Sequence, residues 1–345
     1  MPLYTYTIEL SDEWDKVVRS FSSYDVYYLP GYVKAFWLHG DGQPMLFYYE
    51  DKNVRGINAV MKRDISDDNF FADKIERKTF FDFITPYGYG GWLIEGGETD
   101  ALFSAYEAWC RENSIVSEFV RYHPMLKNAD LSKNFYNVIP LGKTVFMDIS
   151  SPDTIWANLT SKNRNMVRKA QKNNVKIHRG QYPEIYRTFK VIYDQTMDSD
   201  NAKPYYYFGD AFYDSIRGDL PEESQIFWAE LDGNIIAASI ILFANGNMHY
   251  HLSGSLREYQ NLAPTNLLLY EAALWGCENG YKTLHLGGGV GSKEDSLYKF
   301  KSAFNRNETA QFSIGKKVYS DNVYNELALM KNTPTSEGFF PKYRA

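Results

Sequence analysis

Residues 248–305 read MHYHLSGSLREYQNLAPTNLLLYEAALWGCENGYKTLHLGGGVGSKEDSLYKFKSAFN, and they gather the least usual side chains of the chain into one unit. Alternating polar residues at the start predict a strand, the apolar run TNLLLYEAALWG predicts a helix, and TLHL predicts a second strand. Three glycines then predict a turn that lets other groups approach the backbone closely, before a last helix. The segment is therefore predicted to be a strand–helix–strand–turn–helix unit.

The last helix of this unit carries an unusual cation. Leu297, Phe300 and Phe304 fall at helical spacing and predict an apolar stripe. Lys301 lies inside that stripe, four residues after Leu297 and three before Phe304. Lysine is rarely buried, so its ammonium group either extends to water or points into a cleft, and both alternatives fit the pattern.

Alternation along the first strand predicts which of its side chains share a face. We expect one face to hold His249, His251 and Ser253, and the other to hold Tyr250 and Leu252. His251 is a candidate general base, because imidazole titrates near neutral pH. Paired strand histidines can also ligate a metal, but no further ligand at metal-like spacing accompanies them, so no metal site is expected.

Length and composition predict a folded protein of two domains. The chain has 345 residues, of which 44% are hydrophobic and 17% aromatic, which excludes disordered and fibrous classes. Its net charge of -6 gives no global nucleic-acid signature. The N-terminus has no signal-peptide pattern, and the longest apolar run, 235–244, is too short to span a bilayer. We expect a cytoplasmic protein with two reduced thiols, Cys110 and Cys277.

The same elements are predicted twice in the chain. MLFYYE-DKN-VRGINAVMKR and IFWAEL-DGN-IIAASIILF each predict a hairpin. Residues 106–113 followed by EFVRYHP, and residues 270–279 followed by KTLHL, each predict a helix and then a strand. This shared order predicts a duplicated α/β unit, with a first domain at 1–150 and a second at 151–316.

A basic segment lies between the two predicted domains. From Thr154 to Pro183 there is no acidic residue, and Ser161 is a suitable N-cap for a helix that ends near Asn173. A solvated basic face is the simplest interpretation, and a phosphate, pyrophosphate or RNA partner is the alternative. The cations of the segment are Lys162, Arg164, Arg168, Lys169, Lys172, Lys176 and Arg179, of which the second, third and fifth form one ridge.

Three stretches resemble a known family. They are LTSKNRNMVRKAQKNNVKI, the loop TPYGYGG (Thr85 to Gly91), and the segment from HYHLSGS to LYKFKSAF. Together they resemble the FemAB-like branch of the GNAT acyltransferase superfamily, which includes the aminoacyltransferases that build peptidoglycan cross-bridges. The resemblance covers most of the chain, and FKxxF at 300–304 is its most specific part. It implies two tandem GNAT-like acyltransferase domains of α/β (α+β) class with a groove between them, the first completed by residues 317–345.

The resemblance also implies a chemistry and a set of site residues. Lys301 would stabilise the oxyanion that forms when an amine attacks an acyl group, and His251 or Tyr250 would contact the reacting centre. Arg164 and Arg168 would bind a phosphate-bearing substrate through their guanidinium groups. The remaining candidate substrate-binding residues are Tyr87, Tyr89, Tyr206, Asn266 and Ser253.

Donor and acceptor follow from departures from the family pattern. The turn 260–265 has no glycine and contains Pro264, which degrades the usual coenzyme A cradle and favours a different donor such as aminoacyl-tRNA. The acidic net charge is unfavourable for a large polyanion, so acyl-CoA and aminoacyl-tRNA both stay open as donors. No tightly bound cofactor is expected. A small-molecule or lipid-linked cell-envelope or polysaccharide precursor is the expected acceptor; Lys34 is off register for a nucleotide-sugar contact. The alternatives are an acetyl-CoA-dependent amino-sugar N-acetyltransferase and a non-catalytic RNA- or anion-binding protein.

Overall fold

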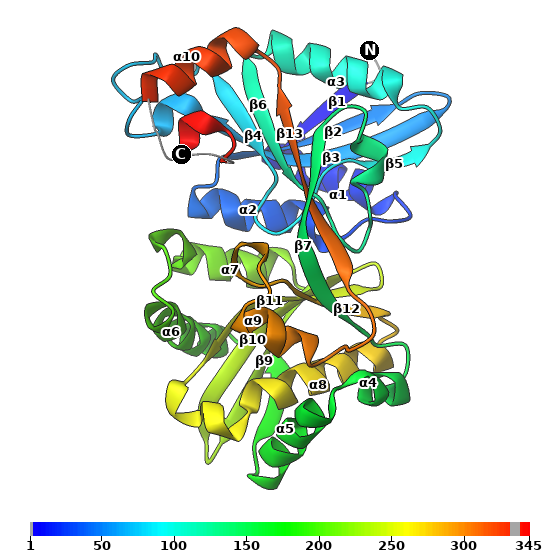
Figure 1. The fold of residues 1–345 in the computed structure, drawn as a ribbon, viewed down its shortest axis with the longest axis vertical. Helices are drawn as coiled ribbons and strands as arrows, with labels where there is room; N and C mark the ends of the chain where they lie inside the picture. The colour runs from blue at the N-terminus through cyan, green and yellow to red at the C-terminus, as the bar shows by residue number, and fades with distance from the viewer. Residues whose placement is uncertain (1–2, 332–338) are drawn as a thin grey trace. The chain divides into compact units, whose positions relative to one another are not determined.

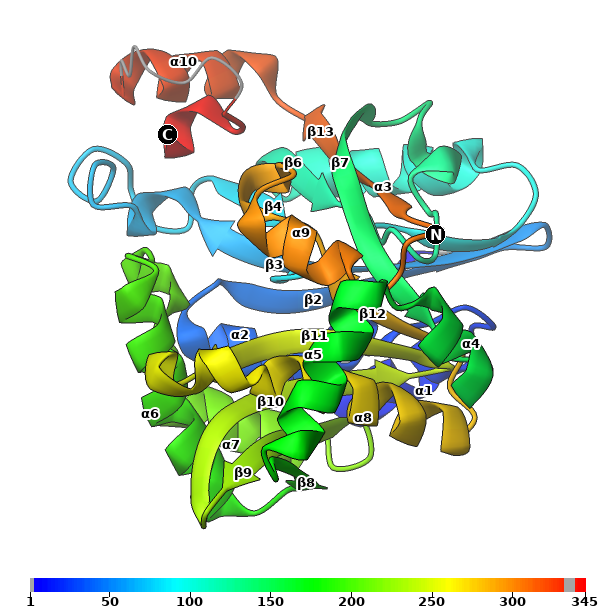
Figure 2. The ribbon, with the colours of Figure 1, turned by 60° about the horizontal axis from the view of Figure 1, so that its bottom comes forward.

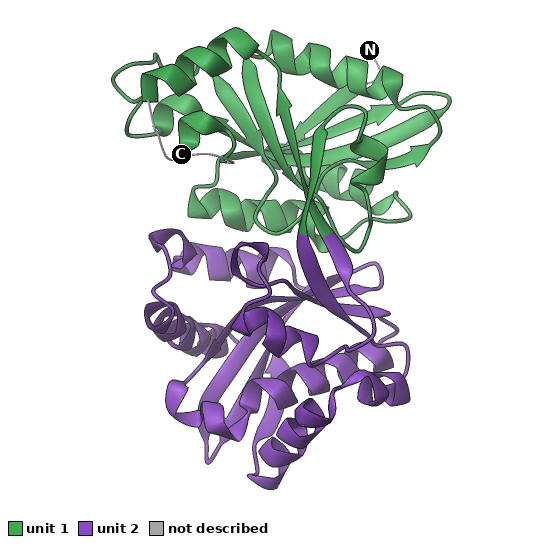
Figure 3. Ribbon diagram, in the orientation of Figure 1, with its two compact units in different colours: residues 1–141, 312–345 green, residues 142–311 purple. Residues whose placement is uncertain are grey.

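The computed structural model describes residues 3–331 and 339–345 and has the predicted α/β class. The chain forms two compact units (Figure 3). Residues 1–141 and 312–345 make up the first unit, and residues 142–311 make up the second. In the described ranges, no helix is both long enough and apolar enough to cross a membrane.

The first unit is built on a sheet with the strand order β1-β2-β3-β4-β6-β13, and β5 pairs with β3. Neighbouring strands are antiparallel except for β4 and β6, which run parallel. The strands are β1 (Leu3–Thr7), β2 (Gln43–Glu50), β3 (Val54–Asp64), β4 (Phe81–Ile84), β5 (Leu93–Gly96), β6 (Ile115–Arg121) and β13 (Ala310–Val318).

Helices cover both faces of this sheet. In Figure 1, α3 lies on one side and α1 and α2 on the other. The side chains of α3 join β2 and β6 in one aromatic core that contains Phe47, Tyr106 and Ile115. The helices of this unit are α1 (Ser11–Arg19), α2 (Pro30–His39), α3 (Asp100–Glu112) and α10 (Asp321–Lys331).

The second unit repeats the strand order of the first, as β8-β9-β10-β11-β12-β7. Its parallel pair, β11 and β12, again lies between the fourth and fifth positions. The strands are β7 (Asn137–Asp148), β8 (Lys176–Gly180), β9 (Ser224–Leu231), β10 (Asn234–Ala244), β11 (Asn247–Ser255) and β12 (Thr283–Gly287).

One face of the second sheet is packed by α8, and α6 contacts β10 and β11. Figure 2 shows α5 and α8 side by side, in agreement with their contacts. The helices are α4 (Pro152–Asn158), α5 (Ser161–Lys172), α6 (Pro183–Ser199), α7 (Asp210–Asp219), α8 (Pro264–Glu278) and α9 (Ser296–Ser302).

The predicted duplication is confirmed, because the two predicted hairpins are β2–β3 and β9–β10 and the two helix–strand pairs are α3–β6 and α8–β12. Local chemistry fixes both hairpin turns. Asp51 Oδ1 accepts hydrogen bonds from the backbone N–H groups of Asn53 (2.7 Å) and Val54 (3.0 Å). In the second turn Asp232 and Gly233 both have positive φ, 50° and 80°, as a two-residue hairpin turn requires.

The boundary between the units falls inside β7, at residues 141 and 142, rather than at 150 and 151. The sequence pattern breaks at the later position because β7 ends at Asp148 and Ser151 caps α4 through its side chain. A crossing within a continuous strand leaves no such break. The chain passes from the first unit to the second along β7 and returns to the first along β13. Each of these strands is the last in the sheet order of the unit that the chain enters.

The end of the chain packs on the first unit. Arg344 Nε donates to Asp82 Oδ2 at 3.0 Å, and Arg63 Nε donates to Asp82 Oδ1 at 2.8 Å. The hydroxyl groups of Tyr343 and Ser117 lie 2.7 Å apart in the core. Asp82 is fully buried, so both guanidinium groups stabilise a carboxylate that would be costly to bury alone.

Candidate functional site

The parallel strands of the second unit separate soon after they pair. β11 and β12 are in register only from Asn247 to His249 and from Thr283 to His285, although both strands continue. Separated strands leave backbone groups that need other partners. Lys301 supplies one of them, because its Nζ donates to the carbonyl oxygen of Gly288 at 2.8 Å, just beyond the end of β12.

The short helix α9 holds Lys301 in this place. Asp295 caps the helix, since its Oδ1 accepts from Tyr298 N at 2.9 Å, and its Oδ2 accepts from Val290 N at 3.0 Å. A Cβ atom at Gly289 would lie 2.4 Å from Asp295 Oδ1, so this position requires glycine. The glycine run therefore lets the loop after β12 close onto the cap of the helix that carries Lys301.

The apolar stripe predicted for α9 is wrong at Leu297. Leu297 is 38% exposed, whereas Tyr298 and Lys301 are both 9% exposed. The helix has only seven residues and ends at Ser302, so Phe304 packs in the core from beyond its end. Of the two alternatives for Lys301, the structure supports the inward one.

Burial changes the acidity of this lysine. Removal from water lowers the pKa of Lys301 to about 8, against the weaker opposing charge of Asp295. The ring of Tyr250 lies on the same side, with its centroid 6.0 Å from Nζ. At neutral pH the ammonium form therefore predominates, in surroundings where its charge is poorly screened.

A bulge in β11 corrects the predicted faces of that strand. Ile240 on β10 opposes Leu252, whereas the next residue, Ile241, opposes Tyr250, so His251 is the extra residue. The extra residue reverses the alternation after it. Ser253 therefore faces the same side as Tyr250 rather than the histidine side, and its Oγ accepts a hydrogen bond from Ser239 Oγ at 2.9 Å.

Tyr250 and Ser253 belong to one polar group near Lys301. Burial raises the pKa of Tyr250 to about 12, although hydrogen bonds with Ser253 and Ser239 oppose the shift. The Tyr250 hydroxyl is thus protonated at neutral pH and can donate a hydrogen bond. The second unit brings three predicted site residues together: Lys301, Tyr250 and Ser253.

His251 lies on the other face of β11. The backbone of Tyr193 in α6 would be 2.9 Å from a Cβ atom at Gly254, which places α6 against that face. Burial, with a smaller effect of His249, lowers the pKa of His251 to about 3. A general base works best when its pKa is near the working pH, so this low pKa disfavours the predicted base role of His251. The His249 and His285 rings pack edge to face at 5.8 Å.

The basic helix α5 begins one residue earlier than predicted, because Thr160 is the N-cap and its Oγ1 accepts from Asn163 N at 3.2 Å. Arg164 is engaged by the backbone at the end of α4. Its Nη1 donates to the carbonyl oxygens of Trp156 (3.3 Å) and Leu159 (3.0 Å), which end α4. Asn174, with φ of 58°, ends the helix region as predicted.

Asn266 also makes a contact that holds helices together. Its Nδ2 donates to Asn163 Oδ1 at 2.7 Å, and Asn163 Nδ2 donates to the Ala303 carbonyl at 3.3 Å. The Thr160 N–H donates to the same carbonyl at 3.0 Å. These bonds join α8 and α5 to the end of α9, so Asn163 and Asn266 position the lysine helix.

Other cations of α5 face solvent. Arg168 stacks on Trp156, with its guanidinium carbon 5.1 Å from the ring centroid. Within the described residues, no ion pair involves Arg168 or its neighbours Lys169 and Lys172. We call the exposed cations Lys162, Arg168, Lys169 and Lys172 the α5 basic face. Tyr206 is half-buried between α6 and α7, edge to face with Tyr205 at 5.4 Å.

Tyr87 and Tyr89 belong to the first unit, in the loop that follows β4. Tyr87 stacks on Phe36 at 5.3 Å, and Tyr89 packs edge to face on Tyr27 at 5.5 Å. Gly88, with φ of 94°, keeps the loop close to Tyr27, because a Cβ atom there would lie 2.5 Å from that ring. Both tyrosines are therefore held by packing within this unit.

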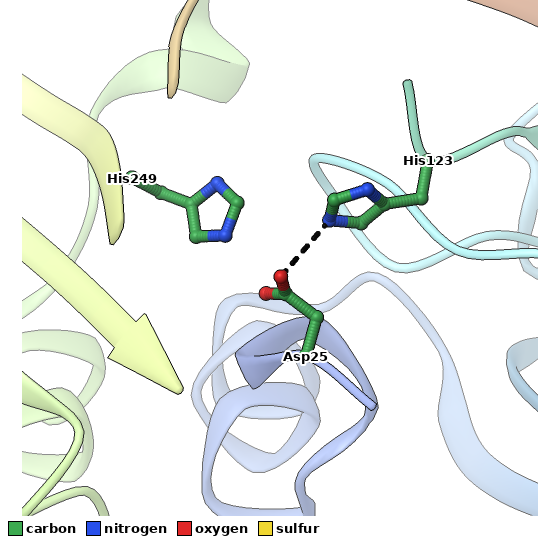
Figure 4. Close-up of side chains that lie close together, drawn as sticks. All are labelled: Asp25, His123 and His249. Carbon is green, nitrogen blue, oxygen red and sulfur yellow. Dashed lines mark ion pairs between the residues drawn. The ribbon is translucent and has the colours of Figure 1, made fainter. Parts of the chain in front are cut away.

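Sequence reasoning missed a buried acid–imidazole pair beside this loop. His123 Nε2 lies 3.3 Å from Asp25 Oδ2, and both side chains are fully buried (Figure 4). His123 Nδ1 accepts the N–H of Leu126 at 3.2 Å, so the proton of the neutral ring sits on Nε2 and faces the carboxylate. The two residues are about a hundred positions apart, and nothing in the local pattern links them.

The model of the acetyltransferase (GNAT) domain family matches residues 161–302. The second unit carries a GNAT domain. That GNAT domain contains α5, the β9–β12 strands and the lysine of α9. No curated protein matches the chain.

Solved structures extend the similarity from the GNAT domain to the whole chain. The crystal structure of FemX has a TM-score of 0.69 at 14% identity and covers 94% of this chain and 99% of its own. The C-terminal domain of a putative lysylphosphatidylglycerol synthetase from Agrobacterium fabrum follows, with a TM-score of 0.55, 14% identity and 94% of each chain. L-PGS from Bacillus licheniformis has a TM-score of 0.52 at 13% identity, with 87% and 91% covered. At these identities the similarity is one of fold, and the predicted FemAB-like tandem GNAT fold is confirmed.

Replacing Lys301 should stabilise the protein. Its pKa of about 8 lies below the unfolded value of about 10.4, so below pH 8 the native state holds an unfavourable buried charge. We expect Lys301→Met to raise the free energy of unfolding in urea at pH 7 by about 2 kcal/mol, net of the lost bond to Gly288. Wild-type stability should rise from pH 8 to 10, and that rise should vanish in the variant.

Lys299→Met is the matched control, because Lys299 is exposed on the same helix. We expect its free energy of unfolding to stay within about 0.5 kcal/mol of wild type. A Lys301→Met variant less stable than Lys299→Met at pH 7 would show that the buried ammonium group stabilises the fold instead.

Proposed function

We propose that this chain is an N-acyltransferase that moves an aminoacyl or acyl group to an amine of a cell-envelope or polysaccharide precursor. The GNAT domain and the tandem GNAT fold support the reaction class. The observation that carries the proposal is Lys301, a buried ammonium group beside diverging parallel strands. Its place within the GNAT domain makes it the candidate for the group that stabilises developing negative charge.

In the proposed reaction, the acceptor amine nitrogen attacks the acyl carbonyl carbon. A C–N bond forms, negative charge gathers on the carbonyl oxygen, and the bond from the carbon to the leaving oxygen or sulfur then breaks. The proton lost by the amine ends on the leaving group. Lys301 donates a hydrogen bond to the oxyanion, and an oxyanion donor in a poorly solvated site contributes about 3 kcal/mol.

Tyr250 supports this step as a neutral donor. Its hydroxyl has a pKa of about 12, so it remains protonated throughout the physiological range and can donate to the carbonyl or the leaving group. Ser253 and Ser239 orient it through the hydrogen bonds described above. His251, with a pKa of about 3, takes no proton in this scheme.

For the donor we propose aminoacyl-tRNA. The turn before α8 is a 3₁₀ segment, Arg257–Leu262, followed by Ala263 with φ of 58° and by Pro264, which has no N–H to offer a pyrophosphate. The α5 basic face offers exposed cations for a phosphate backbone, with Arg168 in place of the occupied Arg164. One fold neighbour is named for lysylphosphatidylglycerol, an aminoacylated lipid, which favours a lipid-linked acceptor.

A second candidate donor is acetyl-CoA, favoured by the match to an acetyltransferase domain model. Under that alternative the chain would acetylate an amino sugar.

Lys301 is tested by activity. With labelled aminoacyl-tRNA or acetyl-CoA and an extract of envelope precursors, Lys301→Met should lower kcat/KM by about 10²- to 10³-fold, as loss of an oxyanion donor does. Wild-type kcat/KM should fall as pH rises through about 8, because the free enzyme then loses the ammonium proton. Lys301→Arg should retain activity without this falling limb, since guanidinium stays charged.

Lys299→Met is again the control variant. It should keep the wild-type kcat/KM and the same fall of kcat/KM as pH rises through about 8. Full turnover by Lys301→Met would remove the assigned role of the lysine.

The donor is tested by binding. Affinity for tRNA should fall steeply with salt, and replacing Arg168, Lys169 and Lys172 with glutamine should reduce the slope of log K against log salt by about 0.9 per lost phosphate contact. The same three changes should leave coenzyme A binding, measured by calorimetry, unaltered. Arg77→Gln, at an 82% exposed cation of the first unit, is the control and should keep the wild-type slope.

If coenzyme A binds with micromolar affinity and the affinity for tRNA does not depend on salt, acetyl-CoA is the donor and the proposed aminoacyl-tRNA is wrong. Salt-steep tRNA binding with no product from any donor would indicate a non-catalytic RNA-binding protein.

A further inference from the structure

The carboxyl ends of the parallel pair in the first unit meet at one edge of its sheet. β4 and β6 are in register up to Ile84 and Phe119, and a further parallel bridge joins Gly90 to Tyr122. In open α/β sheets, ligands bind outside the carboxyl ends of parallel strands. The residues delivered to this edge are the loop 85–91 and Arg121, the last residue of β6.

Arg121 stands out among the arginines of this unit. Its Nε is shielded from solvent without a hydrogen-bond partner, and no ion pair of Arg121 occurs in residues 3–331 or 339–345. Arg63 and Arg344, by contrast, both bind Asp82. A shielded guanidinium N–H without an acceptor costs free energy, so an acceptor from a ligand would satisfy a donor that the fold leaves open.

Aromatic rings fix the guanidinium in place. Its carbon lies 5.9 Å from the ring centroid of Tyr87 and 5.8 Å from that of Phe312. Tyr89 packs edge to face on Phe312 at 5.7 Å. Stacking on aromatic rings orients a guanidinium group and leaves its N–H groups free to donate hydrogen bonds. Because these N–H groups lie in one plane, two of them can bind a carboxylate or phosphate at once.

The backbone around Arg121 is also held firmly. Its N–H donates to Thr85 Oγ1 at 2.9 Å, and its carbonyl accepts from Gly90 N at 2.8 Å. Gly91, with φ of 86°, admits the ring of Tyr122, which would lie 2.8 Å from a Cβ atom there. The loop and the strand end therefore form one preorganised edge, which lowers the cost of binding a ligand there.

Asp25, the buried acid described beside this loop, pairs with His123, whose Nε2 lies 3.3 Å from Asp25 Oδ2. The tyrosines beside Arg121 carry no charge at neutral pH, since burial raises the pKa of Tyr89 to about 12 in spite of the opposing charge of Arg121. Burial also raises the pKa of Tyr27 well above its ordinary value. This edge of the sheet thus presents a cation together with neutral hydroxyl groups, a set that matches an anionic ligand group.

We propose that this edge of the first unit is an anion-binding site, in which Arg121 binds a carboxylate or phosphate group of a ligand. Tyr87 and Phe312 hold the guanidinium, and Tyr89 packs against Phe312. The inference goes beyond the transferase reaction and depends only on residues of the first unit.

NMR of the arginine side chain tests the site directly. Because Arg121 Nε is shielded, its N–H should give a resolved signal, which can be assigned by through-bond correlation to the Arg121 backbone amide in the wild-type chain. The chain is titrated separately with inorganic phosphate and with acetate, each against sodium chloride of equal ionic strength. The Nε–H signal of Arg63, which donates to Asp82 at 2.8 Å, is the internal control.

We expect the Arg121 signal to shift and to saturate with at least one of the two anions, while the Arg63 signal stays in place. The anion that saturates at the lower concentration identifies the ligand group as phosphate or carboxylate. Arg121→Lys keeps a charge but loses the fork, and should raise the half-saturating concentration by about tenfold. Shifts no larger than those with chloride, or shifts that do not saturate, would overturn the proposal. No acyl transfer is measured, so this outcome is independent of the tests on Lys301.

Discussion

The hydrogen bond from the buried Lys301 ammonium group to the Gly288 carbonyl is the interaction on which the proposed chemistry of the second unit depends. The bond is made just beyond the end of β12, where β11 and β12 have parted after three paired residues. Asp295 and the close approach at Gly289 fix the helix that delivers the lysine. Asn163 and Asn266 then join that helix to α5 and α8. An electrostatic catalyst requires this kind of fixed, poorly solvated placement.

Duplication explains how one chain carries two different sets of polar residues at equivalent sheet edges. Six strands follow the same order in each unit as described, with the fourth and fifth parallel, and the first unit adds β5 beside β3. The residues at the carboxyl ends of the parallel pair are different in the two units. In the second unit the end of β12 meets Lys301, whereas in the first the end of β6 presents Arg121 among aromatic rings. The fold thus supplies two equivalent places, and local substitution gives each its own charge and shape.

Much of the fold, and part of the site, follow from the sequence, because they rest on local patterns. Hairpins with Asp–x–Asn turns, the repeat order and the lysine in an otherwise apolar helix face all produce short-range signals. The bulge at His251 could not be predicted. The extra residue changes which face of the strand each later side chain takes, but it leaves no mark in the polar and apolar pattern of the sequence. The sequence also gives no sign that the Arg164 guanidinium bonds to backbone carbonyls at the end of α4, because that contact depends on how α4 and α5 pack. The Asp25–His123 pair and the setting of Arg121 likewise join distant parts of the chain.

Direct titration of the Lys301 amino group is the most stringent test of this account. The protein is labelled with ¹³Cε-lysine, the Lys301 signal is identified by its absence from Lys301→Met, and its chemical shift is followed from pH 6 to 11. The account predicts a midpoint of about 8. A midpoint near 10.4, the value of a lysine in water, would contradict it, because the amine would then be solvated and unable to act as a buried electrostatic catalyst.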